Sequence, residues 1–177
     1  MTKKMVALLV IAALALQVLS SCATNQGTSA LAFKLSDMTG RQVSLTEYKG
    51  QKAVLLLFTN CNSGGIQDPL LQSYITRYQR ASGLETFCVA NGAAIPTDVR
   101  QYMAGQPGGC PMDAAGASNT LPLVDTDGSV SKSFGANPDK LTLVLVDRTG
   151  SICFREEVAA SAEADTELAR QIDEVTK

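Results

Sequence analysis

The chain has 177 residues, of which 15 are basic and 17 acidic, and it contains neither histidine nor tryptophan. This length is enough for one domain with a real hydrophobic core. The absence of histidine excludes Cys–His and serine-type catalysis and nearly all zinc chemistry, so we expect no metal and no cofactor. No basic cluster occurs along the chain, which argues against a nucleic-acid partner.

The first 21 residues contain the parts of a bacterial secretory signal peptide. Lys3 and Lys4 form a positive start, and Met5 to Leu16 is an unbroken run of twelve apolar residues, too short to span a bilayer as a mature helix. The sequence LSSC follows and ends at Cys22. It resembles the lipobox, in which the signal is cut before a diacylated cysteine whose new amino terminus is then acylated. The alternative is an ordinary signal peptide followed by a chance cysteine.

A lipidated Cys22 would hold the protein on a membrane, because several acyl chains bind more firmly than one. Residues 22–32 are mainly small or polar and predict a flexible tether. Ala23 is not the aspartate that often retains lipoproteins at the inner membrane, which favours the outer membrane. We therefore expect a lipid-anchored protein on the periplasmic side of a bacterial cell envelope, with one domain over residues 33–177.

Apolar patterning predicts the elements of this domain. Residues 33–50 alternate apolar and polar around a turn at Thr39-Gly40, which predicts a hairpin and a loop. Ala53–Phe58 is a continuous apolar run, typical of a strand buried on both faces. An amphipathic helix ending near Gly83 is predicted from apolar residues at every fourth position: Ile66, Leu70, Tyr74 and Tyr78.

The rest of the chain alternates in the same way. We expect, in order, a strand at 84–90, a short helix at 98–104, a long loop at 105–119, a short helix at 130–134, strands at 141–147 and 151–158, and a final helix capped by Ser161. A mixed sheet with helices on both faces, in the α/β class, satisfies this order.

These segments resemble the thioredoxin-like redoxins, the superfamily that includes the alkyl hydroperoxide reductase/thiol-specific antioxidant proteins and the membrane-tethered thiol reductases. FKLSDMTGRQVSLTEYKGQKAVLLLF resembles the opening of the family, and LPLVDTDGSVSKSFG with LVLVDRTGSI resembles its back half. Cys61 stands just past the core strand, where the family has its reactive cysteine. Pro69 matches the proline that kinks the active-site helix. The resemblance covers nearly all of residues 33–177 and implies a thioredoxin-like fold.

Three positions depart from the pattern of the family. Gly64 stands where the second cysteine of a CxxC pair would be, and Phe58 stands where peroxiredoxins have threonine or serine. The arginine of peroxiredoxins and the cis-proline of thioredoxins would both fall near Leu141. The tryptophan of glutathione peroxidases is absent as well. The resemblance therefore predicts the fold more firmly than the activity.

Cys61 is the candidate nucleophile. A thiolate is the reactive form of cysteine, and the start of a helix stabilises negative charge through its N–H groups and dipole. Residues beside Cys61 can donate hydrogen bonds to its sulfur, cap the helix or leave the sulfur accessible. They are Thr59, Asn60, Asn62, Ser63 and Gly64. The alternative is a packed residue, or half of a structural disulfide, left over from an ancestral site.

The other cysteines allow several pairings. Cys110 lies in the glycine-rich loop, whose freedom a resolving cysteine needs, and is our candidate for that role. Alternatively, Cys110 forms a structural bridge to Cys88 or Cys153. Cys88 and Cys153 fall in predicted strands, where packing is the usual role of a cysteine. The sequence leaves the pairing open.

Two functional hypotheses follow. In the first, a membrane-tethered thiol-redox protein uses Cys61 to attack a peroxide or a disulfide, and Cys110 (or Cys88) resolves the product. An unidentified thiol or disulfide protein would be its partner. In the second, a non-catalytic thioredoxin-like lipoprotein acts as a binding or scaffold module. Because Gly64 stands in place of the second cysteine of a CxxC pair, the sequence argues against disulfide reductase activity more strongly than against peroxidase activity.

Overall fold

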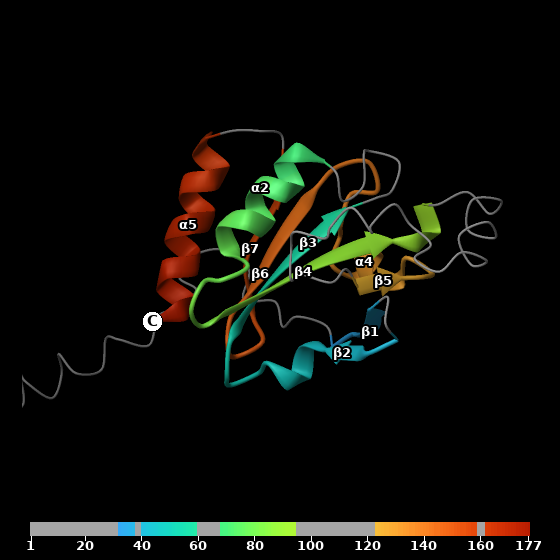
Figure 1. The fold of residues 1–177 in the computed structure, drawn as a ribbon, viewed down its shortest axis with the longest axis horizontal. Helices are drawn as coiled ribbons and strands as arrows, with labels where there is room; N and C mark the ends of the chain where they lie inside the picture. Colours follow the sequence, from blue (N-terminus) through green and yellow to red (C-terminus); the bar gives the residue numbers. More distant parts are fainter. Residues whose placement is uncertain (1–31, 38–39, 60–67, 95–122, 159–161) are drawn as a thin grey trace, which may run out of the picture.

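The computed structural model describes residues 32–37, 40–59, 68–94, 123–158 and 162–177. These residues form one sheet of seven strands in the order β2-β1-β5-β4-β3-β6-β7 (Figure 1). The strands are β1 (Lys34–Asp37), β2 (Gln42–Ser44), β3 (Ala53–Thr59), β4 (Leu84–Asn91), β5 (Leu123–Asp125), β6 (Thr142–Val146) and β7 (Ile152–Glu157). The helices are α2 (Pro69–Tyr78), α4 (Ser129–Ser133) and α5 (Ala162–Thr176), with short 3-10 segments η1 (Leu45–Glu47) and η3 (Gly92–Ala94).

Strand β3 lies inside the sheet, and every one of its residues is buried. It pairs in parallel with β4 and antiparallel with β6. Because successive side chains of a strand point to opposite faces, its alternate residues enter two different core clusters: Ala53, Leu55 and Leu57 in one, and Val54, Leu56 and Phe58 in the other. Burial on both faces explains why the run AVLLLF has no polar residue.

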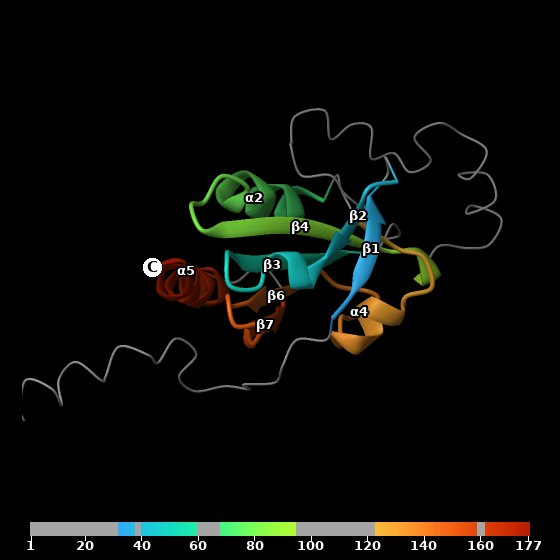
Figure 2. The same cartoon turned by 90° about the horizontal axis from the view of Figure 1, so that it is seen from below.

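Helices cover both faces of the sheet. The first core cluster joins β3 to residues of α2 and α5, which lie side by side (Figure 1). The second cluster includes Phe134, directly after α4, and α4 lies apart from the other two helices, beside β1 (Figure 2). The predicted α/β class, with a mixed sheet and helices on both faces, is confirmed.

Helix α2 begins at a capping aspartate. The Asp68 carboxylate accepts a hydrogen bond from the Leu70 N–H at 2.8 Å, and Pro69 occupies the first helical turn, where its missing N–H costs nothing. The sequence predicted a start near Ile66, but residues 60–67 lie outside the described part. The buried face of the helix consists of Leu71, Tyr74, Ile75 and Tyr78, and Leu70 is only half-buried.

Strand β5 was not predicted from the sequence. It has three residues and pairs in parallel with β4 and antiparallel with β1. So short a run carries no readable alternation, and its pairing depends on residues far away in the chain. The predicted strands at 84–90, 141–147 and 151–158 correspond to β4, β6 and β7. The helix predicted at 98–104 and the loop predicted at 105–119 lie outside the described residues.

Candidate functional site

The candidate site lies where the parallel strands β3, β4 and β5 end. Open α/β sheets place ligands and reactive groups at this carboxyl edge. Thr59 ends β3 opposite Ala90 and is buried, and Cys61 follows two residues later in the chain. The remaining predicted site residues lie outside the described part, so their roles stay predictions: Cys22, Asn60, Cys61, Asn62, Ser63, Gly64 and Cys110.

Helix α2, which follows this segment, is tied to α5 by a buried tyrosine. The Tyr74 hydroxyl donates a short hydrogen bond to the Asp165 carboxylate, and the Arg77 guanidinium lies 3.2 Å from the other oxygen of that carboxylate. Burial, reinforced by the hydrogen bond to Asp165, raises the pKa of Tyr74 well above its ordinary value. The phenol therefore stays protonated at neutral pH and holds α2 in place against α5.

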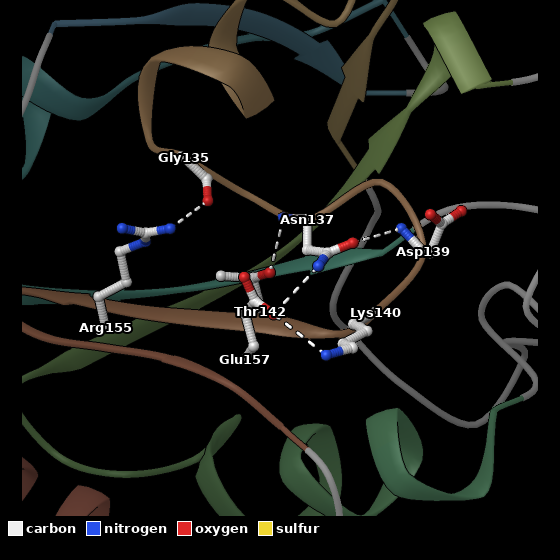
Figure 3. Close-up of polar contacts among 7 residues, drawn as sticks. All are labelled: Gly135, Asn137, Asp139, Lys140, Thr142, Arg155 and Glu157. Atoms are coloured by element: carbon white, nitrogen blue, oxygen red, sulfur yellow. Dashed lines mark hydrogen bonds and ion pairs between the residues drawn. The ribbon is translucent and has the colours of Figure 1, made fainter.

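The loop before β6 approaches the same edge, because Thr142 is paired with Phe58 near the end of β3. Asn137 lies at the centre of its polar contacts (Figure 3). Its backbone N–H donates to Thr142 Oγ1 at 3.0 Å, and its side-chain oxygen accepts from the Asp139 N–H at 2.9 Å. Its side-chain nitrogen donates to Glu157 at 3.0 Å. One asparagine thus fixes the turn and attaches it to β7.

Two basic residues add to this attachment. Lys140 Nζ lies 3.4 Å from Glu157, and the Arg155 guanidinium donates to the Gly135 carbonyl (Figure 3). The hydrogen bond from Asn137, followed by that from Lys140, lowers the pKa of Glu157 below its ordinary value. Sequence analysis missed this cluster, because only the pairing of β6 with β7 brings Glu157 beside residues 137–140.

By the family resemblance, the cis-proline of thioredoxins would fall near Leu141. The described residues include no cis peptide bond. The Leu141 carbonyl accepts a hydrogen bond from the Val158 N–H at 2.8 Å, so its backbone is held by β7. Side-chain hydrogen bonds of Asn137 hold the turn that contains Pro138 and attach it to Glu157 of β7.

The two described cysteines lie in different strands of the sheet. Cys88 is fully buried in β4, opposite Leu57. Cys153, in β7, is disulfide-bonded. Packing, the role expected of Cys88 from the sequence, agrees with its burial, whereas Cys153 has a covalent role that its strand position did not reveal.

The described residues contain neither a metal-binding cluster nor a membrane-spanning helix. Within those ranges, no group of three or more Cys, Asp or Glu side chains is arranged to hold a metal ion. Asp125 and Asp127, two residues apart before Gly128, do not belong to such a group. Asp125 accepts hydrogen bonds from the backbone N–H and the hydroxyl of Ser131, both at 2.6 Å. No described helix is long and apolar enough to cross a membrane.

Comparison with known proteins identifies the fold. No family model and no curated protein sequence matches the chain. Among solved structures, the thioredoxin domain of a Bacteroides vulgatus thiol-disulfide oxidoreductase superposes with a TM-score of 0.58 at 18% identity, covering 85% of this chain and 99% of that one. The fold is thioredoxin-like.

Two further solved structures with this fold are a thioredoxin and a peroxiredoxin. The exposed lipoprotein thioredoxin of Streptococcus pneumoniae has a TM-score of 0.58 and 19% identity, over 80% of this chain and 99% of that one. The mitochondrial 2-Cys peroxiredoxin of Plasmodium falciparum has a TM-score of 0.55 and 15% identity, over 84% and 92%. Identities this low establish a shared fold, and function has to be argued from the residues.

Proposed function

We propose that the protein is an extracytoplasmic thiol-redox protein in which Cys61 attacks a peroxide or a disulfide. The observation that carries the proposal is the position of β3. This fully buried strand runs through the sheet and ends at its carboxyl edge, two residues before Cys61. Neither described cysteine is a good candidate for the nucleophile, because Cys88 is fully buried and Cys153 is disulfide-bonded.

The chemistry needs two sulfurs in sequence. With a peroxide, the Cys61 thiolate attacks one oxygen, the O–O bond breaks, and the other oxygen leaves as an alcohol or water after taking a proton. A second thiol then attacks the sulfenic acid, releases water and forms a disulfide. With a disulfide substrate, attack breaks the S–S bond and gives a mixed disulfide, which the second thiol opens. An external dithiol, or two external thiols, then reduces the protein disulfide, supplies the two electrons and leaves as a disulfide.

Cys110 is the proposed second thiol, as predicted from the sequence. Gly64 offers no sulfur at the usual position, so the resolving group has to come from elsewhere in the chain or from a partner. Export and anchoring through an acylated Cys22 remain part of the proposal. The lipobox-like sequence supports them, and the similarity to an exposed lipoprotein thioredoxin is compatible with them.

Stopped-flow mixing of the reduced mature protein with hydrogen peroxide, and separately with an aromatic disulfide reagent, tests the assignment. Cys61→Ser should abolish the fast reaction. Cys110→Ser should leave the first attack intact but trap a sulfenic acid or a mixed disulfide at Cys61. Cys88→Ala is the matched control and should react like the parent.

The binding-module hypothesis retains one supporting observation. By the family resemblance, the cis-proline of thioredoxins would fall near Leu141, and position 141 holds leucine instead. If no thiol of the reduced parent reacts faster at neutral pH than an unstructured cysteine, the catalytic proposal is wrong and the binding module takes its place.

A further inference from the structure

A cavity lies at the opposite end of β3 from the candidate functional site. Its volume is about 350 Å³, which falls within the range of roughly 300–1,000 Å³ that is usual for small-molecule sites. Val54 of β3 lines the cavity and precedes Thr59 by five residues, or roughly 17 Å along the strand. A ligand bound here would therefore be separate from the carboxyl edge of the sheet.

The floor of the cavity is apolar. Val54 and Val146 line it and are paired directly opposite each other in β3 and β6. Leu45, the first residue of η1, lines it as well. All three belong to the second core cluster, and each is at most 7% exposed. A ligand in the cavity thus meets side chains that offer hydrophobic contact and no hydrogen bonds.

Backbone hydrogen bonds hold the loop that forms one wall of the cavity. In this loop, which follows η1, the Lys52 N–H donates to the Tyr48 carbonyl at 3.0 Å. The Gly50 N–H donates to the Arg148 carbonyl at 2.7 Å, which joins the loop to the turn between β6 and β7. Gly150 of that turn also lines the cavity. The cavity is therefore preformed, as ligand sites usually are.

Lys49 places a positive charge at the mouth of the cavity. It lines the cavity and is exposed. Its side chain reaches the turn between β6 and β7, since its Cδ, Cε and Nζ atoms each lie 3.8 Å from the position that a Cβ on Gly150 would take. Among the described residues, no acidic side chain forms an ion pair with Lys49. Its ammonium group is thus accessible to an anion from solution.

The other charged residues of the lining already have partners. Lys52 Nζ lies 2.6 Å from a carboxylate oxygen of Glu85. Asp147 is the one acidic residue among the described residues of the lining. Its Oδ1 accepts three hydrogen bonds at 2.7–2.8 Å, from the N–H and the hydroxyl of Thr149 and from the Ser151 N–H. Its charge is therefore stabilised by donors of its own turn.

These features together select one class of ligand. A cation would meet two lysines at the cavity, and a purely apolar molecule would cover the Lys49 ammonium without offering it an acceptor. A carboxylate can accept charge-assisted hydrogen bonds from that ammonium while an attached apolar chain occupies the floor. We propose that the cavity binds a small amphipathic monoanion, a carboxylate on a short apolar chain of the fatty-acid type. Lys49 contacts the carboxylate, and Leu45, Val54 and Val146 contact the chain.

Titration with sodium octanoate, followed by two-dimensional NMR of the backbone amides, tests the proposal. The mature chain, residues 22–177, is produced without its signal, so that neither an acyl chain nor detergent competes for the cavity. We expect saturable shifts of the amide signals of Lys49, Val54, Val146 and Gly150. Sodium acetate, which lacks the chain, and octylamine, which carries the opposite charge, should give no saturable shift of these signals at the same concentrations.

Two outcomes of this titration overturn the proposal. The first is the absence of saturable octanoate shifts at the residues of the lining. The second is equal binding of octanoate and either control compound, since the site would then recognise only the chain or only the charge. The titration involves no thiol reaction, so failure of the proposed redox function would leave its result unchanged.

Two lysine variants with the same loss of charge locate the carboxylate. Lys49→Gln removes the ammonium at the cavity, and Lys132→Gln removes one from the exposed surface of α4. Both positions are exposed, so both variants should fold, and amide signals away from the substitution report this directly. We expect Lys49→Gln to weaken octanoate binding by about fivefold or more, and Lys132→Gln to leave it within about twofold of the parent. Equal dissociation constants in the two variants would show that Lys49 does not bind the carboxylate, and the proposal would be wrong.

Discussion

Two stacked tyrosines on α2 provide a matched test of what holds that helix. The rings of Tyr74 and Tyr78 lie 6.5 Å apart, and both residues are buried. The Tyr74 hydroxyl donates to Asp165, whereas the buried Tyr78 hydroxyl has no hydrogen-bond partner among the described residues. Replacing either tyrosine by phenylalanine removes one oxygen and keeps the ring, so the two variants differ mainly in the hydrogen bond.

The expected magnitude follows from the exposure of the acceptor. A hydrogen bond to a charged group contributes about 1.5–3 kcal/mol. The Asp165 side chain is 38% exposed, so water replaces part of the lost bond, and Tyr74→Phe should lower the free energy of unfolding by about 1–2 kcal/mol. For a domain of this size that is a fall of about 3–6 °C in the thermal midpoint. Tyr78→Phe should leave stability unchanged or raise it by about 1 kcal/mol, because it removes an unsatisfied buried group.

Urea unfolding followed by circular dichroism measures both changes, and a double-mutant cycle with Asp165→Asn isolates the pair. An alkaline series adds a second readout. The pKa of Tyr74 is raised in the folded state, so above pH 10 the unfolded chain releases a proton that the folded chain retains, and stability falls as pH rises. Tyr74→Phe should remove part of that fall, and Tyr48, whose pKa burial also raises, should keep the rest. Equal losses in the two phenylalanine variants would refute the reasoning.

Three further predictions concern other parts of the molecule. Asp125→Ala should cost about 2–4 kcal/mol in urea unfolding, because it leaves the buried Ser131 N–H and hydroxyl without their acceptor, and Ser131→Ala should cost less. Glu157→Gln should flatten the thermal-midpoint profile below about pH 4.5. The lowered pKa of Glu157 gives stability that is present above that pH and is lost as pH falls through the folded-state value. Cys22→Ala should give an unprocessed or soluble product in cell fractionation, and membrane partitioning like that of the parent after cleavage would contradict the lipid anchor.

The parts of the fold that could be predicted from the sequence are those where burial alone dictates composition. Ala53–Phe58 and Leu143–Val146 are apolar throughout because β3 and β6 are covered on both faces. Strand β4 is also buried over most of its length, although it contains Glu85 and Thr86. Strand β5 was missed, since its three residues acquire their role only by pairing with β4 and β1.

The candidate site was less predictable because its contacts are non-local. Glu157 meets Asn137 and Lys140 through the register of β6 against β7, and no local pattern encodes that register. The β-bulge between Ile152 and Phe154, which turns Cys153 into the core, is equally invisible in the sequence SICFREE. The spacing of Cys61 after β3 was readable from the sequence, but its reactivity stays a prediction.

Cys88 can be ruled out as a fast resolving thiol on energetic grounds. Its side chain is fully buried in the core between β4 and α2. Cys88 lies opposite Leu57 in the sheet, and Cys61 comes four residues after Leu57 in the chain. An attack on an oxidised Cys61 would require β4 to separate from β3 or α2 to lift away, and opening a central element costs nearly as much as global unfolding. At about 5–15 kcal/mol, such openings are populated at roughly 10⁻⁴ or less, too rarely to sustain turnover. Rapid reduction of Cys61 therefore depends on Cys110 or on a thiol of another protein.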